Sequence, residues 1–322
     1  MPDSPAPTFA APAPYDPSFA EVLDLLPGRL MPSAAQIDVL RGFPTASLDD
    51  LRAAANFDHE ERTVPGRDGA PAVLLSIFTP TTRRAAAPVL YHVHGGGMVS
   101  GDRFNGVEQA LGWVERLGVV VVSVEYRLAP EHPHPAPIED CYTGLVWLAQ
   151  HADDLGVAAD RIIVYGASAG GGLAAGLALM ARDRAFPTLA GQLLDSPMLD
   201  DRNGTVSSHQ FDDVGIWDRV TNDVGWTALL GEGHAFREVS PYAAPARASN
   251  LGGLPPTYLL AAAGEVFRDE AVDYASRVWA AGGSLDLHVY SGAMHSYKQL
   301  APDSPVSRAA AAGMDDWVSR MI

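Results

Sequence analysis

The sequence RIIVYGASAGGGLAAGLALMARDR, residues 161–184, gives the clearest indication of the fold. It opens with a short apolar run, IIVY, which is typical of a buried strand. A turn of small residues follows, and then a run rich in Ala, Leu and Met that favours a helix. A buried strand joined to a helix by a tight turn is the repeating unit of a parallel sheet with helical crossovers. The sequence therefore predicts that such a sheet lies at the centre of the protein.

The same alternation repeats on both sides of this unit. The apolar runs VLYHVH (89–94) and VVVVSVEY (119–126) are each followed by a helical pattern, at 107–118 and 137–152. Further strands are expected at 189–195, 256–263 and 285–292, and further helices at 269–283 and 305–321. Apolar runs that alternate with helices predict an α/β fold with a mostly parallel central sheet covered by helices on both faces.

Two segments depart from this alternation. Residues 18–56 carry short helical patterns, and residues 201–250 form a long polar stretch. Because a structureless loop of that length is unusual in a compact domain, we expect residues 201–250 to form an inserted helical cap over the carboxyl ends of the strands. The expected organisation is a disordered or extended arm at 1–17, N-terminal cap helices at 18–56, an α/β domain at 57–200 and 251–322, and a cap insertion at 201–250.

Composition narrows the range of functions. The 322 residues include 22 Lys and Arg against 39 Asp and Glu, a formal net charge of −17. This charge disfavours partners such as nucleic acid and anionic membrane surfaces, because both reward basic patches. No apolar run approaches the roughly 20 residues that cross a bilayer, and the proline-rich first 17 residues do not resemble a secretory signal. We expect a cytoplasmic protein whose fold needs no disulfide, since Cys141 is its single cysteine.

The turn within the opening stretch, Gly166-Ala167-Ser168-Ala169-Gly170, fits the pattern G-x-S-x-G. The pattern is short enough to arise by chance, but here the serine lies between a predicted strand and a predicted helix. A tight turn at that place lifts the hydroxyl out of the sheet, and the helix N-terminus faces developing negative charge. The alternative interpretation is a serine that only caps the helix. Ser168 is therefore a candidate nucleophile.

A second motif, His94-Gly95-Gly96-Gly97, comes directly at the end of the predicted strand 89–94. Three glycines leave backbone N–H groups free to donate to a ligand oxygen, which is what an oxyanion hole requires. The alternative is a flexible turn or a phosphate-binding loop. A P-loop is excluded because no Lys-Ser/Thr follows, and the glycine spacing does not fit a dinucleotide site.

Together and in this order, the two motifs resemble the hormone-sensitive-lipase-like group of α/β-hydrolases, also called bacterial family IV esterases. The resemblance runs from about residue 59 to the end, through YHVHGGGMVSGD, VSVEYRLAPEHPHPAPIEDC, VYGASAGGGLA, LLDSPMLD, GEVFRDE and GAMHSYK. The first 55 residues match only in general character. The resemblance implies an α/β-hydrolase fold with a helical cap, and hydrolysis of short- to medium-chain acyl esters without a metal or organic cofactor.

The resemblance also implies a catalytic triad in the chain order nucleophile, acid, histidine. Ser168 matches the nucleophile. His295 matches the histidine in the loop after the last predicted strand, whereas His288 lies within that strand and is expected to be structural. The acid position matches Glu265, where relatives usually carry Asp followed by Pro. Asp269 is the rival acid, but it lies at the start of the following helix, where an acidic residue is ordinary.

The remaining site assignments follow from the same resemblance. The oxyanion hole falls on the N–H groups of Gly96, Gly97 and Ala169. Ala167 stands where many relatives carry an acidic residue or Thr, a departure that should not stop acyl transfer. Three aromatic residues are candidate walls of the substrate pocket, with ordinary core packing as the alternative: Phe211, Trp217 and Tyr297.

The expected function is that of a serine carboxylesterase acting on a small-molecule ester. His132 and His134 have the spacing of two metal ligands, but their proline-locked segment, similar in the family, argues against a metal site. Two alternatives stay open: a hydrolase of a lactone, amide, thioester or acetylated small molecule, and a ligand-binding protein of this fold without turnover. The resemblance allows a homodimer, which no feature of the sequence decides.

Overall fold

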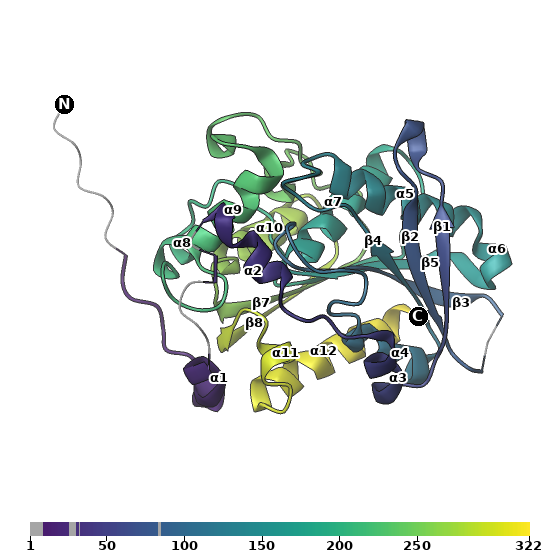
Figure 1. Ribbon diagram of the computed structural model, residues 1–322, viewed down its shortest axis with the longest axis horizontal. Coiled ribbons are helices and arrows are strands. Elements are labelled where there is room, and N and C mark those ends of the chain that lie inside the picture. The colour runs from purple at the N-terminus through teal and green to yellow at the C-terminus, as the bar shows by residue number, and fades with distance from the viewer. Residues whose placement is uncertain (1–8, 26–29, 32, 83–84) are drawn as a thin grey trace.

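The computed structural model describes residues 9–25, 30–31, 33–82 and 85–322, and its centre is one twisted sheet (Figure 1). The strand order is β1-β2-β4-β3-β5-β6-β7-β8. β1 and β2 pair antiparallel, β2 joins β4 antiparallel, and all other neighbours are parallel. The strands are β1 (Asp58–Val64), β2 (Val73–Thr79), β3 (Ala87–Val93), β4 (Val120–Glu125), β5 (Val157–Ala167), β6 (Gly191–Asp195), β7 (Thr257–Gly264) and β8 (Leu285–Met294).

Helices cover both faces of this sheet because the strand residues are apolar on both sides. In β4, for example, Val122 and Val124 belong to one core and Val121 to the other. The first core packs under α5 (Ala136–Gln150), α7 (Ala169–Asp183) and α10 (Arg268–Ala280). The second packs under α4 (Glu108–Leu117) and α12 (Pro305–Met321). The predicted α/β fold, with a mostly parallel sheet between two helical layers, is confirmed.

The predicted strands and helices lie within a few residues of the observed ones. The largest extension is β5, which begins at Val157 rather than at Arg161 because Val157 pairs with Ala87 before a register shift in the ladder. Two short helices were not expected: α6 (Ala152–Leu155) and α11 (Tyr297–Leu300). Within the described part of the chain, no helix combines the length and apolarity needed to span a bilayer.

The segment expected to supply N-terminal cap helices is divided between two places. It contains α1 (Ala20–Leu25), α2 (Ile37–Arg41) and α3 (Leu48–Ala54). Arg41, at the end of α2, donates to the carbonyls of Val99 and Ala129, in the loops beyond β3 and β4. By contrast, Leu51 of α3 is buried in the second core with Trp113 of α4. Of α2 and α3, therefore, α2 reaches the carboxyl ends of the strands, where Figure 1 also places α8 (Val206–Gln210) and α9 (Arg219–Leu230).

The start of the chain reaches across the molecule. Residues 1–8 of the expected arm lie outside the described residues. In the described part, Phe9 stacks on His209 of α8 with 4.9 Å between ring centroids. The backbone N–H of Asp16 donates to the carbonyl of Gly292 in β8, at 2.9 Å. Residues 9–16 therefore form an extended segment that contacts both α8 and the last strand.

Candidate active site

Ser168 occupies the tight turn between β5 and α7. Its backbone has φ 57° and ψ −123°, a conformation that L-residues rarely adopt and that surrounding contacts must hold. One such contact is the Ser168 N–H, which donates to the Asp195 carbonyl at the end of β6, at 2.8 Å. A Cβ on Gly170 would lie 2.1 Å from the Val93 carbonyl oxygen, so only glycine lets α7 approach β3 this closely. The turn thus presents the Ser168 side chain at the carboxyl end of the sheet.

Three of the predicted site residues meet in a hydrogen-bonded chain. His295 Nε2 lies 3.0 Å from Ser168 Oγ, and His295 Nδ1 lies 2.5 Å from Glu265 Oε2. The other carboxylate oxygen of Glu265 accepts the Ala262 N–H at 2.8 Å, which fixes the side chain against the end of β7. His295 and Glu265 are 6% and 1% exposed. The imidazole is therefore held between a buried carboxylate and the serine hydroxyl.

The two rival residues have other partners. Asp269 accepts the backbone N–H of Ser207 at 2.7 Å and pairs with Arg268 at 2.7 Å. Burial alone would raise the pKa of Asp269, but these contacts outweigh it and lower the pKa. His288 stacks on Tyr258 in the sheet, with 4.7 Å between ring centroids. The structure gives neither residue a contact with Ser168.

The glycine-rich loop after β3 lies directly beside Ser168. A Cβ on Gly95 would lie 3.5 Å from Ser168 Cβ. The loop is braced by His94, whose ring stacks on Tyr126 at 4.0 Å and whose Nδ1 lies 2.8 Å from the Gly95 carbonyl. Burial lowers the pKa of His94, so the ring stays neutral. Gly97 has φ 64°. The loop thus lies next to Ser168, and its role as an oxyanion hole stays a prediction.

The three predicted aromatic walls take different positions. The indole of Trp217 lies against Gly97, where a Cβ would come within 2.1 Å of it, and its N–H donates to Asn222 at 3.1 Å. Phe211 is buried near Tyr15, with 6.4 Å between ring centroids. Tyr297 is buried edge-on to the ring of Phe19, at 6.1 Å. Of the three, Trp217 is the one in contact with the glycine loop; the wall roles stay predictions.

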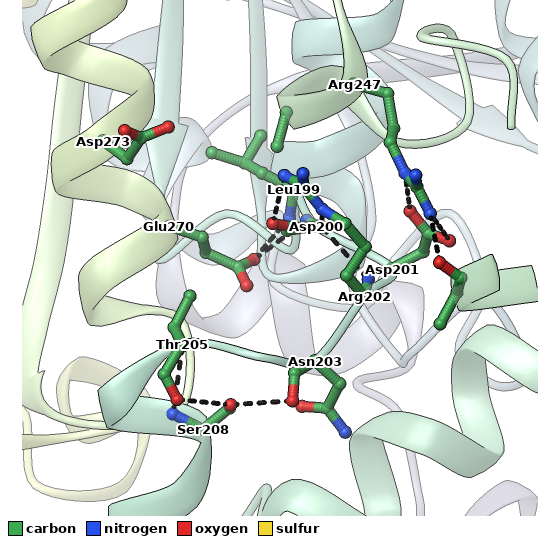
Figure 2. A network of polar contacts seen from close by, with 12 residues as sticks. Leu199, Asp200, Asp201, Arg202, Asn203, Thr205, Ser208, Arg247, Glu270 and Asp273 are labelled. Carbon is green, nitrogen blue, oxygen red and sulfur yellow. Dashed lines mark hydrogen bonds and ion pairs between the residues drawn. The ribbon is translucent and has the colours of Figure 1, made fainter. Parts of the chain in front are cut away.

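A buried polar network holds the segment that leads from β6 into residues 201–250 (Figure 2). Glu270 of α10 accepts the backbone N–H groups of Leu199 and Asp200, at 2.7 and 3.2 Å. Burial raises the pKa of Glu270 well above its ordinary value, and the nearby Asp200 adds to this. Asp201, fully buried, accepts two hydrogen bonds from Arg247, at 2.7 and 2.9 Å. The residues directly before 201–250 are thus held by α10, and Arg247, near the end of that stretch, is bonded to Asp201 at its start.

Two features near the site were not singled out from the sequence. Lys298 and Asp195 form a buried ion pair beside Ser168. Lys298 is the single lysine of the chain, a compositional signal that could have drawn attention to it. Tyr15 packs on Gly264, the residue before Glu265, and burial and the Glu265 charge raise its pKa to about 12. No sequence signal marks Tyr15, because its partners lie far along the chain.

Metal ligands do not gather in the described part of the chain. No group of three or more His, Cys, Asp or Glu side chains is placed to hold an ion among these residues. Of the two histidines with ligand-like spacing, His134 donates its backbone N–H to the Leu229 carbonyl at 3.0 Å, which ties the proline-rich turn to α9.

The chain is similar to known proteins in both sequence and structure. The family model described as alpha/beta hydrolase fold matches residues 90–299. The carboxylesterase NlhH of Mycobacterium tuberculosis is 33% identical over 94% of this chain and 95% of its own length. The esterase LipI of the same organism is 37% identical over 73% of each chain. A solved structure titled bacterial heroin esterase is 38% identical and superposes with a TM-score of 0.87 over 95% of this chain and 98% of that one. The chain belongs to the hormone-sensitive-lipase-like group of the α/β-hydrolase family.

Proposed function

We propose that this protein is a serine carboxylesterase in which Ser168, His295 and Glu265 form the catalytic triad. The observation that carries the proposal is the continuous chain of contacts from Glu265 through His295 to Ser168, at 2.5 and 3.0 Å. The relatives named carboxylesterase and esterase support the same reaction class. An unbroken series of contacts from carboxylate to imidazole to hydroxyl argues for catalytic turnover rather than for ligand binding alone.

Acylation begins with attack of Ser168 Oγ on the ester carbonyl carbon. His295 Nε2 takes the hydroxyl proton, and Glu265 stabilises the imidazolium through Nδ1–H. The carbonyl oxygen becomes an oxyanion that accepts hydrogen bonds from the N–H groups of Gly96, Gly97 and Ala169. Ala169 is the first residue of α7, so its N–H has no acceptor within the helix. Collapse of the intermediate breaks the ester C–O bond, and His295 gives its proton to the leaving alcohol.

Deacylation reverses these roles with water. His295 takes a proton from a water molecule, and the hydroxide attacks the acyl carbon of the Ser168 ester. The second tetrahedral intermediate releases the carboxylic acid, and the proton returns to Ser168 Oγ. Each cycle therefore consumes one ester and one water, and it leaves one alcohol, one acid and the free enzyme.

The substrate class proposed is a small-molecule ester with a short to medium acyl chain. Trp217 is 6% exposed and covers the α-carbon of Gly97, so a bulky ring lies next to the place where the acyl oxygen is bound. Such a ring limits the volume open to the acyl chain. A series of nitrophenyl esters from acetate to laurate measures this limit, and kcat/KM is expected to fall with the longer chains.

The test is labelling by a fluorophosphonate, followed by intact mass and peptide mapping, together with hydrolysis of nitrophenyl acetate and butyrate. We expect one adduct on Ser168, and loss of both the adduct and turnover in Ser168→Ala. His295→Ala should lose the adduct while keeping the fold. Absence of Ser168-dependent turnover on every ester tested would contradict the proposal.

A further inference from the structure

Lys298 of α11 forms a buried ion pair with Asp195 at the end of β6. The side chains are 7% and 4% exposed, and Lys298 Nζ donates to Asp195 Oδ2. All other basic side chains of the sequence are arginines or histidines. An ammonium is compact, whereas a guanidinium is a wide planar fork. The lysine at this buried position therefore differs from the arginines of the chain in the compact shape of its cation, with the same charge.

Each partner of the pair is linked directly to a residue of the proposed triad. Asp195 accepts the Ser168 N–H on its backbone carbonyl, at 2.8 Å, and so holds the strained turn. Lys298 comes three residues after His295, on the same short loop and helix. The side of Ser168 that faces α11 contains a cavity of about 20 Å³, which all four residues line. The ion pair thus joins the end of β6, to which the Ser168 backbone is bonded, to the segment that carries His295.

We propose that Lys298 and Asp195 act as a positioning pair that sets the Ser168–His295 geometry and the electrostatic field at His295. This inference rests on the proposed esterase function. In a buried environment the two charges balance, so the imidazole experiences little net field from them. Removing one charge leaves the other uncompensated close to His295. The sign of the effect on His295 must then depend on which charge remains.

The phenols that face the pair stay neutral over an ordinary assay range, and the further carboxylate, Glu265, is the same in every variant. Besides Lys298, three phenols feel the charge of Asp195, and burial raises the pKa of each of them: Tyr165 of β5, Tyr258 of β7 and Tyr297 of α11. Tyr297 also feels the charge of Glu265, the carboxylate bonded to His295, and the phenol of Tyr290 in β8. Glu265 is present in every variant considered below, so it does not alter their comparison.

The experiment compares Lys298→Met, Asp195→Asn and the double variant in full-length protein, with kcat/KM for nitrophenyl acetate measured across pH. Lys298→Met leaves Asp195 negative, so the acidic limb of the profile should shift upward by about 0.5 pH unit or more. Asp195→Asn leaves Lys298 positive, so the limb should shift downward by a similar amount. Both single variants should lose roughly 10-fold or more in kcat with a smaller change in KM, because geometry rather than binding is disturbed. The double variant should return the limb toward that of the wild type.

The controls separate this inference from the proposed function and from general destabilisation. Asp140→Asn breaks the ion pair of Asp140 with Arg127. The Asp140 side chain is 4% exposed, like that of Asp195, the Arg127 side chain is 27% exposed, and neither residue lines the cavity. The Asp140→Asn variant should lower stability without shifting the acidic limb of the pH profile. Equal shifts of the same sign in both single variants, or no shift, would overturn the positioning pair. Failure of the wild type to hydrolyse esters or to take the fluorophosphonate would instead overturn the proposed function. If a single variant does not fold, the charge-neutral double variant and the remaining single variant still give the comparison.

Discussion

A glutamate fits the proposed acid position 265 because its longer side chain folds back against its own strand. The carboxylate turns back toward its own strand, where one oxygen accepts the Ala262 N–H, and the other oxygen faces His295 Nδ1. Val266 and Phe267 are fully buried, so the backbone after the acid is fixed by packing. The longer side chain therefore reaches the imidazole from a fixed strand end without any movement of the loop that carries it.

This geometry predicts that Glu265 and Asp269 differ sharply when each is replaced by its amide. Glu265→Gln should lower kcat by about 10³–10⁴-fold, because a neutral amide neither stabilises the imidazolium nor fixes its tautomer. Asp269→Asn should lower kcat by less than about 10-fold, since Asp269 bonds to Ser207 and Arg268 instead. Steady-state kinetics on nitrophenyl butyrate measures both. The reverse ranking would show that Asp269 is the triad acid.

Gly97 offers a second prediction, with an internal control. An alanine at 97 would have φ near 64° and a Cβ about 2.1 Å from the Trp217 ring, so the loop or the indole must move. Gly156 has a similar φ of 68°, with open space around its missing Cβ. Both Gly→Ala variants should lose roughly 1 kcal/mol of stability from the left-handed backbone. Only Gly97→Ala should also lose about 10²-fold or more in kcat/KM. Equal kinetics for the two variants would mean that the loop position does not matter for catalysis.

The sequence predicted the residues around Ser168 better than those that support them. Ser168, Glu265 and His295 occur in short motifs whose order along the chain carries the information, and the fold brings them together. Lys298 and Tyr15 have no such motif, because each acquires its role from a partner far away in sequence. Contacts of this kind depend on how loops of different strands meet, which local patterns do not encode.

Among the helices, α4 and α12 of the second layer are joined through the carboxylate of Asp315. Asp315 of α12 accepts the Trp113 indole N–H of α4 at 2.6 Å and pairs with Arg116 at 2.7 Å. Burial alone would raise the pKa of Asp315, but these two partners outweigh it and lower the pKa below the ordinary 3.8. A carboxylate with a lowered folded-state pKa stabilises the protein above its unfolded-state pKa, and this stabilisation disappears as the pH falls through the folded-state value.

The prediction concerns Asp315→Asn, with Asp316→Asn as the neighbouring control. Asp316 pairs with Arg320 across exposed side chains, 71% and 57% accessible. At pH 7 the first variant should lose about 1 kcal/mol of unfolding free energy and the second less than about 0.5 kcal/mol, because exposed pairs contribute little. The deficit of Asp315→Asn should shrink as the pH falls below about 4. Urea unfolding at pH 7 and at pH 3.5 measures this, and a deficit that does not change with pH would contradict it.

Element types were predictable because buried parallel strands are continuous apolar runs and the helices between them carry few β-branched residues. The packing of α3 was not predictable. Its sequence gives a capping box at Ser47 and Asp50 and a single buried apolar residue, Leu51. A pattern this short indicates a helix but does not say which face of the sheet that helix covers. The position of Leu51 in the second core with Trp113 is decided by tertiary packing.

At the scale of the whole molecule, the described N-terminal segment connects parts that are far apart in sequence. Phe9 meets α8, Tyr15 packs between Phe211 and Gly264, and Asp16 bonds to β8. These contacts surround the strand ends that carry Glu265 and His295. The Tyr15 hydroxyl is buried without a hydrogen-bond partner among the described residues, so its ring rather than its oxygen provides the contact.

Removal of this segment should therefore weaken catalysis. Deletion of residues 2–16 should lower kcat/KM roughly 10-fold and lower Tm by several degrees, because Gly264 and the adjoining acid lose a packing partner. Tyr15→Phe should behave like wild type, since the hydroxyl has no hydrogen-bond partner among the described residues. Tyr15→Ala should reproduce part of the effect of this deletion. If Tyr15→Ala keeps both the kinetics and the thermal unfolding of the wild type, the packing of Tyr15 on Gly264 does not support the active site.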